Sequence, residues 1–259
     1  MILNYKGTNV FYTVNGKGNA IVLLHGFLEN SNMWHAFIPE LSKNNRVISI
    51  DLLGHGNTQC LGYAHTMEDQ AKMVYAVLKH LKLRKYKVIG HSMGGYVALA
   101  FAKLYSKNIK GICLLNSTFT TDDLERKQLR KRANKMALTN YANLVSMSVT
   151  NLFSERSRDI YKAEISKVLK EALNTPVQGY IAGNEGMIMR EDLETFFTKA
   201  SFYKTILLGE KDWIVDAKKM QQYATKNQIE VQVFSEGHMS HIENKNELLE
   251  ALLKFVKKG

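Results

Sequence analysis

Residues 87–95 of the chain are Lys87-Val88-Ile89-Gly90-His91-Ser92-Met93-Gly94-Gly95. The run before Gly90 has the apolar character of a buried strand, and residues 94–106 have the periodicity of a helix. Ser92 therefore lies on a sharp turn between strand and helix, where small residues let the chain pass close to itself. Such a turn exposes the serine hydroxyl and leaves the first helix amides free to bind an anion. The pattern predicts a nucleophilic serine at position 92.

Strand and helix patterns alternate on both sides of this turn. Apolar runs predict strands at residues 9–14, 20–24, 46–50, 87–90, 110–115, 202–208 and 230–234. Helical patterns cover residues 31–42, 66–82, 94–106 and 243–257. The turn residues 15–18 predict that the first two strands pair as a hairpin. The alternation places the chain in the α/β class, with a mostly parallel central sheet flanked by helices.

Between residues 117 and 195 the strand patterns stop, and the sequence is helical in pattern and rich in methionine and aromatic residues. We therefore expect an α/β core of residues 1–116 and 196–259 with a helical insertion at 117–195. Open α/β sheets bind ligands at the carboxyl ends of their strands. The insertion is expected to cover that edge as a cap.

The composition is that of a globular protein rather than a disordered one, because 45% of the 259 residues are hydrophobic and 23% are charged. No apolar run reaches the roughly 18 residues that span a bilayer, and the first residues lack the pattern of a signal peptide. We expect a cytoplasmic protein. Its two cysteines, Cys60 and Cys113, have no C-x-x-C spacing, so neither a disulfide framework nor a metal site is expected.

The net charge of +11 raises the question of an anionic partner. The basic residues are scattered, apart from one cluster at Arg126, Lys127, Arg130, Lys131, Arg132 and Lys135. A solvated helix face is the favoured interpretation of this cluster, with an anionic substrate or surface as the alternative. Nucleic-acid binding is not expected, because it requires a contiguous basic face studded with aromatic residues.

A nucleophilic serine needs a base. His238 and His241 lie directly after the strand at 230–234. A loop after a strand can aim a side chain at the carboxyl edge of the sheet. His238 follows a glycine and ends the turn, so we favour it as the base. His241 begins or precedes the last helix, where a capping or core role is more usual.

The base in turn needs a carboxylate to fix its tautomer. Asp212 follows the strand at 202–208, in a turn that also contains Glu210. Asp216 is a nearby rival but is well placed to cap the following helix. Asp51 follows the strand at 46–50 and is also a candidate on position alone. Asp212 is favoured, and the pattern of residues by itself leaves the other three open.

The oxyanion of a tetrahedral intermediate needs two hydrogen-bond donors. The amide of Met93, directly after the nucleophile, is the first. His25-Gly26-Phe27 follows the strand at 20–24 and can supply the amide of Phe27 as the second. Loss of one such donor typically costs about 2.7–4 kcal/mol of transition-state stabilisation.

Taken together, these motifs resemble the α/β-hydrolase superfamily over essentially the whole chain. His25-Gly26-Phe27 resembles its oxyanion loop, residues 90–95 its nucleophile elbow, Gly209 to Asp212 its acid turn and Gly237-His238 its histidine loop. Residues 51–56 resemble a structural turn of the family, which demotes Asp51 as the acid. The resemblance implies a catalytic triad of Ser92, Asp212 and His238, a helical cap at 117–195, and no cofactor.

The serine at the elbow disfavours epoxide hydrolases and haloalkane dehalogenases, which carry aspartate there. We expect a serine esterase that cleaves a small carboxylic ester, lactone or thioester through an acyl-enzyme. One alternative is a lyase of the menaquinone-pathway type, which uses the same triad and cap arginines. Its possible counterparts are Arg126, Arg130, Arg132, Arg156, Arg158 and Arg190. The other alternative is a catalytically silent ligand receptor on the same fold.

Apolar side chains of the insertion are expected either to line the substrate pocket or to pack the cap, and the two roles are equally favoured for each residue. They are Leu138, Tyr141, Leu144, Met147, Leu152, Phe153, Met187, Ile188 and Met189.

Overall fold

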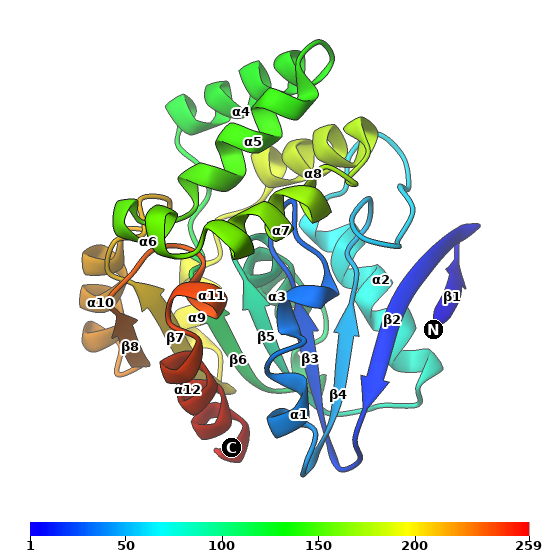
Figure 1. The fold of residues 1–259 in the computed structure, drawn as a ribbon. Helices are drawn as coiled ribbons and strands as arrows, with labels where there is room; N and C mark the ends of the chain where they lie inside the picture. The colour runs from blue at the N-terminus through cyan, green and yellow to red at the C-terminus, as the bar shows by residue number, and fades with distance from the viewer. Residues whose placement is uncertain (259) are drawn as a thin grey trace.

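A computed structural model describes residues 1–258 and contains one eight-stranded sheet (Figure 1). The strands are β1 (Ile2–Tyr5), β2 (Thr8–Asn15), β3 (Asn19–Leu24), β4 (Asn45–Ile50), β5 (Tyr86–His91), β6 (Ile109–Leu115), β7 (Tyr203–Gly209) and β8 (Glu230–Phe234). Their order is β1-β2-β4-β3-β5-β6-β7-β8. β1 and β2 are antiparallel to their neighbours, and all later pairs are parallel. The predicted α/β class is confirmed.

The hairpin predicted from residues 9–14 and 20–24 is wrong, because these two segments, β2 and β3, do not pair. β4 lies between them, antiparallel to β2 and parallel to β3. The connecting turn is glycine-rich for a different reason, because the start of β4 crosses it. A Cβ on Gly16 would lie 2.3 Å from the Asn45 carbonyl oxygen, and one on Gly18 would lie 2.6 Å from that of Asn44.

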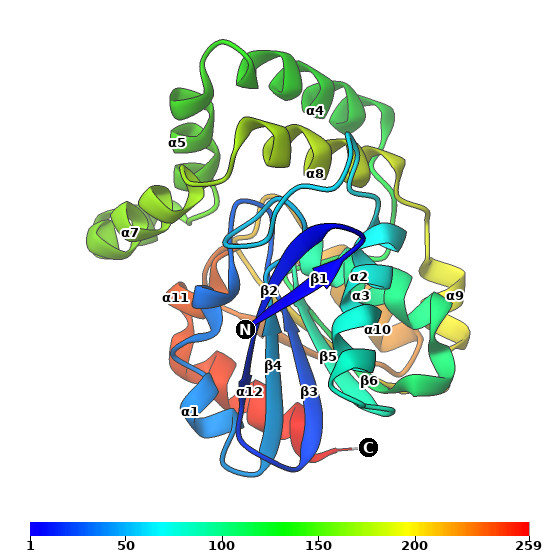
Figure 2. The same cartoon turned by 90° about the vertical axis from the view of Figure 1, so that its right-hand side faces the viewer.

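Helices cover both faces of the sheet (Figure 2). One face packs against α2 (Met67–His80), α3 (Met93–Leu104) and α10 (Ala217–Lys226). The other packs against α1 (Ile38–Leu41) and α12 (Lys245–Lys257). Burial on both faces explains the continuously apolar character of the central strands, such as β3 and β5.

The helix predicted for residues 31–42 is interrupted. The structure has the short 3-10 helix η1 (Ser31–Trp34), followed by α1. Pro39 is the second residue of α1 and has no amide to donate, so it favours a new helix start over continuation. The last predicted helix, at residues 243–257, is confirmed as α12, and the separate short helix α11 (Ser240–Glu243) precedes it.

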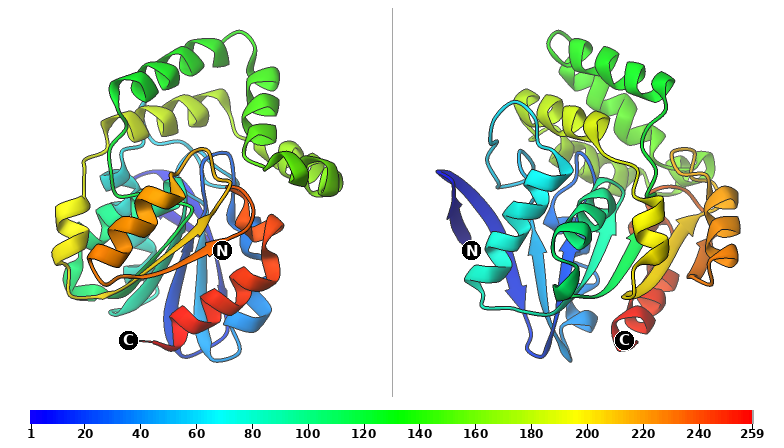
Figure 3. Two further views of the ribbon diagram at one scale, coloured as in Figure 1. Left: turned by 90° about the vertical axis from the view of Figure 1, so that its left-hand side faces the viewer. Right: turned by 180° about the vertical axis from the view of Figure 1, so that it is seen from behind.

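Six helices follow β6 before the next strand begins. They are α4 (Leu124–Ala137), α5 (Tyr141–Asn151), α6 (Glu155–Ile160), α7 (Lys162–Ala172), α8 (Val177–Met189) and α9 (Glu194–Lys199). α4 to α8 lie above the carboxyl edge of the sheet, and α9 lies beside the sheet (Figures 1 and 3). A small apolar cluster joins these upper helices to the core through Leu28 and Met239.

No helix within residues 1–258 combines the length and the apolar character needed to cross a membrane.

Candidate active site

Ser92 forms the turn between β5 and α3 in a backbone conformation that L-residues rarely adopt, with φ of +48° and ψ of −115°. The surrounding glycines make the turn possible. A Cβ on Gly90 would lie 2.3 Å from the Gly94 carbonyl oxygen, and one on Gly94 would lie 2.4 Å from that of Leu24. The amide of Ser92 donates to the Leu115 carbonyl at 2.9 Å, which ties the turn to β6. The strained serine is thus held by contacts on both sides.

His238 and Asp212 are hydrogen-bonded to each other and buried. The Nδ1 atom of His238 lies 2.7 Å from Oδ2 of Asp212. The other carboxylate oxygen accepts from the amides of Ile214 and Val215 at 2.8 and 3.1 Å. Burial alone would raise the pKa of Asp212, but the His238 ring and these donors outweigh burial and lower it. An ionised Asp212 leaves Nε2 of His238 as the free basic nitrogen.

Asn116, which sequence reasoning missed, connects the acid to the histidine loop. Its Nδ2 donates to Oδ2 of Asp212 at 3.0 Å and to the Gly237 carbonyl at 3.3 Å. Its Oδ1 accepts from the Ser240 hydroxyl at 2.8 Å. Asn116 directly follows β6, so its place after a strand end was a signal that could have found it.

The rival candidates have other partners. Asp51 accepts from the amides of Ser31 and Asn57, both at 2.8 Å, as expected of a structural turn. Asp216 accepts from the Lys219 amide and caps α10. Glu210 is exposed. His241 is buried, but its nearest carboxylate is Glu29, at 3.9 Å.

The two amides proposed for the oxyanion lie in the loop after β3 and at the start of α3. Within residues 1–258, neither the Phe27 nor the Met93 amide has an intramolecular acceptor. The Phe27 ring lies 4.9 Å from that of Tyr180 on α8, between ring centroids. The side chain therefore extends toward the helices above the sheet while its amide stays unpaired.

Comparison with known proteins shows the family to which the chain belongs. A sequence profile described as the alpha/beta hydrolase fold matches residues 19–245. The chain belongs to the alpha/beta hydrolase fold family. The 3-oxoadipate enol-lactonase 1 of Acinetobacter baylyi is 28% identical, over 99% of this chain and 96% of the relative.

Two solved structures of the alpha/beta hydrolase fold superimpose on nearly the whole chain. A thermophilic esterase from Thermogutta terrifontis gives a TM-score of 0.93 at 27% identity, covering 99% of this chain and 97% of the esterase. The enol-lactonase from Burkholderia xenovorans LB400 gives 0.92 at 20% identity, covering 100% of both chains. The second likeness shows the fold alone.

A second buried pair, His91 and Glu29, contacts the loop that carries His238. Nδ1 of His91 lies 2.7 Å from Oε2 of Glu29, and its Nε2 lies 3.0 Å from the His238 carbonyl oxygen. The ring centroids of His91 and His238 are 5.0 Å apart, which brings the His238 loop beside the residue that precedes Ser92. Burial opposes ionisation of the pair, but mutual attraction outweighs it, lowering the pKa of Glu29 to about 2 and raising that of His91.

The arginines considered for a polyanionic substrate are largely occupied by the protein itself. Arg190 is buried and Arg130 is half-buried, and both pair with Asp122 at 2.7 Å. Arg126 donates to the Ile214 carbonyl and Arg158 to that of Thr150. The exposed members of the basic cluster on α4 are Lys131, Arg132 and Lys135, as a solvated helix face requires.

The apolar residues of the insertion differ in their burial. Four of them are half-buried: Tyr141, Leu144, Leu152 and Ile188. Phe153 and Met187 are buried in packing, as one of the two expected roles requires. Leu138, Met147 and Met189 are 70%, 63% and 52% exposed, so of the two expected roles, packing inside the cap does not apply to them.

Proposed function

We propose that this protein is a serine hydrolase in which Ser92 is the nucleophile, His238 the base and Asp212 the acid. The observation that carries the proposal is the buried 2.7 Å contact between His238 and Asp212. Ser92, held at φ +48°, directly follows His91, whose ring centroid lies 5.0 Å from that of His238. A serine or histidine with a purely structural role does not require this strained backbone or this buried ion pair. Perturbed, paired groups next to a strained residue are typical of active sites.

In the first step, the Ser92 hydroxyl oxygen attacks the carbonyl carbon of the substrate, and Nε2 of His238 accepts the hydroxyl proton. The amides of Phe27 and Met93 donate to the oxyanion that forms on the carbonyl oxygen. Asp212 holds the imidazole by its Nδ1 and stabilises the imidazolium. When the tetrahedral intermediate collapses, His238 returns the proton to the leaving alkoxide and the acyl group stays on Ser92.

In the second step, His238 removes a proton from water, and the resulting hydroxide attacks the acyl-enzyme. The same two amides stabilise the second oxyanion. Collapse releases the carboxylic acid, and the proton held by His238 returns to the Ser92 oxygen. Nε2 of His238 accepts and returns the proton in both steps. The hydrogen bond between its Nδ1 and Asp212 must therefore persist throughout the reaction.

Small carboxylic esters and lactones are the substrate class that we infer. The full-length matches are named as an enol-lactonase and an esterase. Both reactions begin with attack on an acyl carbon bonded to an alkoxy oxygen, which the mechanism above performs. In a lactone the leaving alkoxide remains attached to the acyl group.

Residues 117–195 are proposed to act as a cap over this site. α8 contributes Tyr180 against the ring of Phe27, and a Cβ on Gly183 would lie 3.1 Å from that ring. The cap therefore lies directly against the oxyanion loop. A cover of this kind excludes water and strengthens the electrostatic contacts beneath it.

Steady-state hydrolysis of short-chain and long-chain p-nitrophenyl esters and of simple lactones tests the proposal. Ser92→Ala should lower kcat/KM by at least about 10⁴-fold, whereas Ser106→Ala, at an exposed serine outside the site, should leave it unchanged. A p-nitrophenol burst should report the acyl-enzyme. Absence of turnover would favour the silent receptor, and carbon–carbon bond cleavage with negligible ester turnover would favour the lyase.

A further inference from the structure

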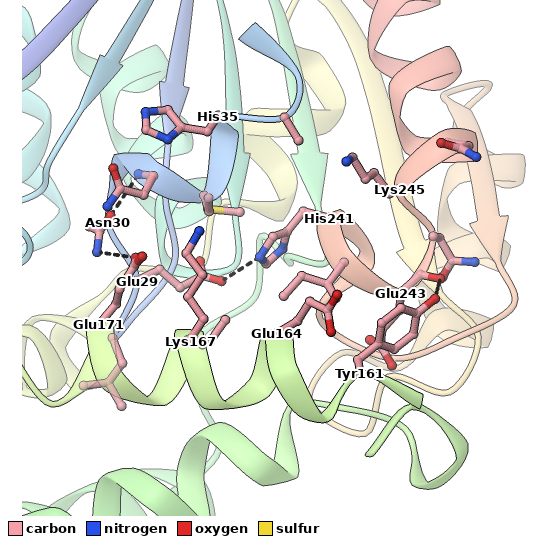
Figure 4. Close-up of a pocket in the computed structure, with 18 of the residues that line it drawn as sticks. Glu29, Asn30, His35, Tyr161, Glu164, Lys167, Glu171, His241, Glu243 and Lys245 are labelled. Carbon is pink, nitrogen blue, oxygen red and sulfur yellow. Dashed lines mark hydrogen bonds and ion pairs between the residues drawn. The ribbon is translucent and has the colours of Figure 1, made fainter. Parts of the chain in front are cut away.

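A cavity of about 690 Å³ lies beneath α7, between that helix, η1 and α11 (Figure 4). Ser92, His238 and Phe27 are not among its lining residues. Glu29 and His241 form part of its wall, so the cavity reaches the buried pair beneath the histidine loop. It is therefore distinct from the substrate site proposed above.

The lining of this cavity is acidic, although the protein as a whole is strongly basic. Five glutamates and two lysines line it: Glu29, Glu164, Glu171, Glu243, Glu247, Lys167 and Lys245. Figure 4 shows the labelled glutamates around the cavity, with Lys167 reaching in from α7. In a chain of net charge +11, a hollow with this excess of carboxylates attracts cations.

Three potential metal ligands gather at the inner end. Glu29, His91 and His241 are all buried, and one ligand atom from each lies within 4.8 Å of the others. Oε1 of Glu29 is buried and has no hydrogen-bond partner within residues 1–258, and it lies 3.9 Å from Nε2 of His241. A buried carboxylate oxygen without a partner is costly and calls for a ligand.

We propose that Glu29, His91 and His241 bind a divalent transition-metal ion such as zinc, with its open coordination positions facing the cavity. Two imidazoles and one carboxylate are a donor set that zinc and its neighbours prefer. Tetrahedral zinc holds its ligand atoms about 3.4 Å apart. Movements of about 1 Å in these side chains therefore bring the three ligand atoms to bonding distance from the ion.

The surroundings of the three ligands suit this role. The Nε2 of His91 donates to the His238 carbonyl, the kind of contact that fixes a ligand tautomer with the other nitrogen directed at the metal. The Gly26 amide donates to Oε2 of Glu29 at 2.6 Å, which leaves Oε1 for the ion. In the absence of metal, the protonated Nδ1 of His91 donates a hydrogen bond to Oε2 of Glu29. The metal takes the place of that proton, which is released to solvent.

The test is titration of the metal-stripped, full-length protein with Zn²⁺ alone, followed by calorimetry with a competing chelator. Wild type should bind one zinc ion per chain. Glu29→Gln and His241→Asn should each weaken binding by at least about 100-fold. Lys167→Met should tighten binding, because it removes a positive charge from the lining. His35→Asn, a change at a cavity-lining histidine outside the cluster, should retain wild-type affinity.

His238→Ala separates this site from the catalytic one, because it removes the histidine paired with Asp212, keeps the backbone carbonyl that His91 contacts, and should leave zinc affinity unchanged. Absence of saturable binding, or equal affinity in His241→Asn and wild type, overturns the proposal. Circular dichroism checks folding, and His241→Asn keeps the test valid if Glu29→Gln does not fold. The binding readout is independent of ester turnover, so either proposal can fail alone.

Discussion

Asp212 receives four hydrogen bonds, from the His238 ring, the Asn116 amide group and two backbone amides. Each donor favours the ionised carboxylate, and together they fix its orientation. Because the Asp212 carboxylate is fixed, its hydrogen bond also fixes the orientation of the His238 ring. The proposed base, His238, is therefore held in one tautomer by its hydrogen bond to Asp212.

Asp212→Asn should lower kcat by about 10⁴-fold with little change in KM, because an amide cannot enforce the required tautomer. Asp216→Asn is the matched control, since the Asp216 side chain caps α10 by accepting from the Lys219 amide. Stopped-flow and steady-state hydrolysis of a p-nitrophenyl ester measure both. Similar losses in the two variants would show that Asp212 acts only through folding.

Asn116→Ala should lower kcat by about 10- to 100-fold, the range expected for losing a hydrogen bond to a charged group. The fall should be in kcat rather than KM, because Asn116 contacts Asp212 and the Gly237 carbonyl. Steady-state kinetics with the same ester provide the measurement. An unchanged kcat would remove Asn116 from the set of positioning residues.

The positions of Ser92, Asp212 and His238 could be predicted because each follows its own strand, and parallel strands bring their carboxyl ends to one edge. The supporting residues could not. Glu29 lies in a loop and meets His91 only because β3 and β5 are neighbours in the sheet. Such pairing depends on strand order, which the periodicity of a sequence does not encode.

At the scale of elements, Asp122 joins the two ends of the inserted segment. It lies between β6 and α4 and accepts from Arg130 on α4 and from Arg190 at the end of α8, both at 2.7 Å. The Arg190 guanidinium also stacks over the Tyr96 ring of α3, 4.2 Å from its centroid. This ion-pair network therefore anchors the upper helices to the core.

Asp122→Asn should lower the free energy of unfolding by about 3 kcal/mol at neutral pH, because it leaves the buried Arg190 and the half-buried Arg130 without a counter-charge. Burial alone would raise the pKa of Asp122, but Arg190 and Arg130 outweigh burial and lower it. The stabilisation is therefore complete above the ordinary carboxyl pKa and is lost as the pH falls through the lowered value.

Urea unfolding of wild type and Asp122→Asn between pH 7 and pH 3 measures this effect. The difference in stability should be constant near neutrality and shrink below about pH 4. A difference that is independent of pH would mean that the charge of Asp122 contributes nothing to the anchor.

Among the elements, the long periodic ones could be predicted and the short ones could not. α2 and α3 repeat their apolar pattern over several turns, whereas β1 has four residues and gave no signal. The mistaken hairpin has a physical cause. Gly16 and Gly18 fit both a tight turn and a close crossing by another strand, and sequence alone does not distinguish the two.

At the scale of the whole molecule, the upper helices approach the core backbone to backbone. A Cβ on Gly179 would lie 2.2 Å from the Gly54 carbonyl oxygen, and one on Gly186 would lie 1.8 Å from that of His65. The His65 amide donates to the Ala182 carbonyl on the same helix, α8, at 2.8 Å. The glycines therefore set how closely α8 approaches the loops after β4.

Gly179→Ala should cost about 2 kcal/mol, since the new methyl group meets backbone that must shift, and this exceeds the gain in helix propensity. In a chain of this size, that cost corresponds to a fall in Tm of about 4–8 °C. Differential scanning calorimetry measures it, with the exposed Gln178→Ala as control. A Tm equal to that of the control would mean that α8 is not closely packed on the core.

The central claim, that Ser92 is the nucleophile, is tested most directly by its reaction with a fluorophosphonate. Intact-protein mass spectrometry should show one adduct per chain, and peptide mapping should place it on Ser92. Ser92→Ala and heat-denatured wild type should form no adduct. Labelling of another residue, or equal labelling of Ser92→Ala, would contradict the account.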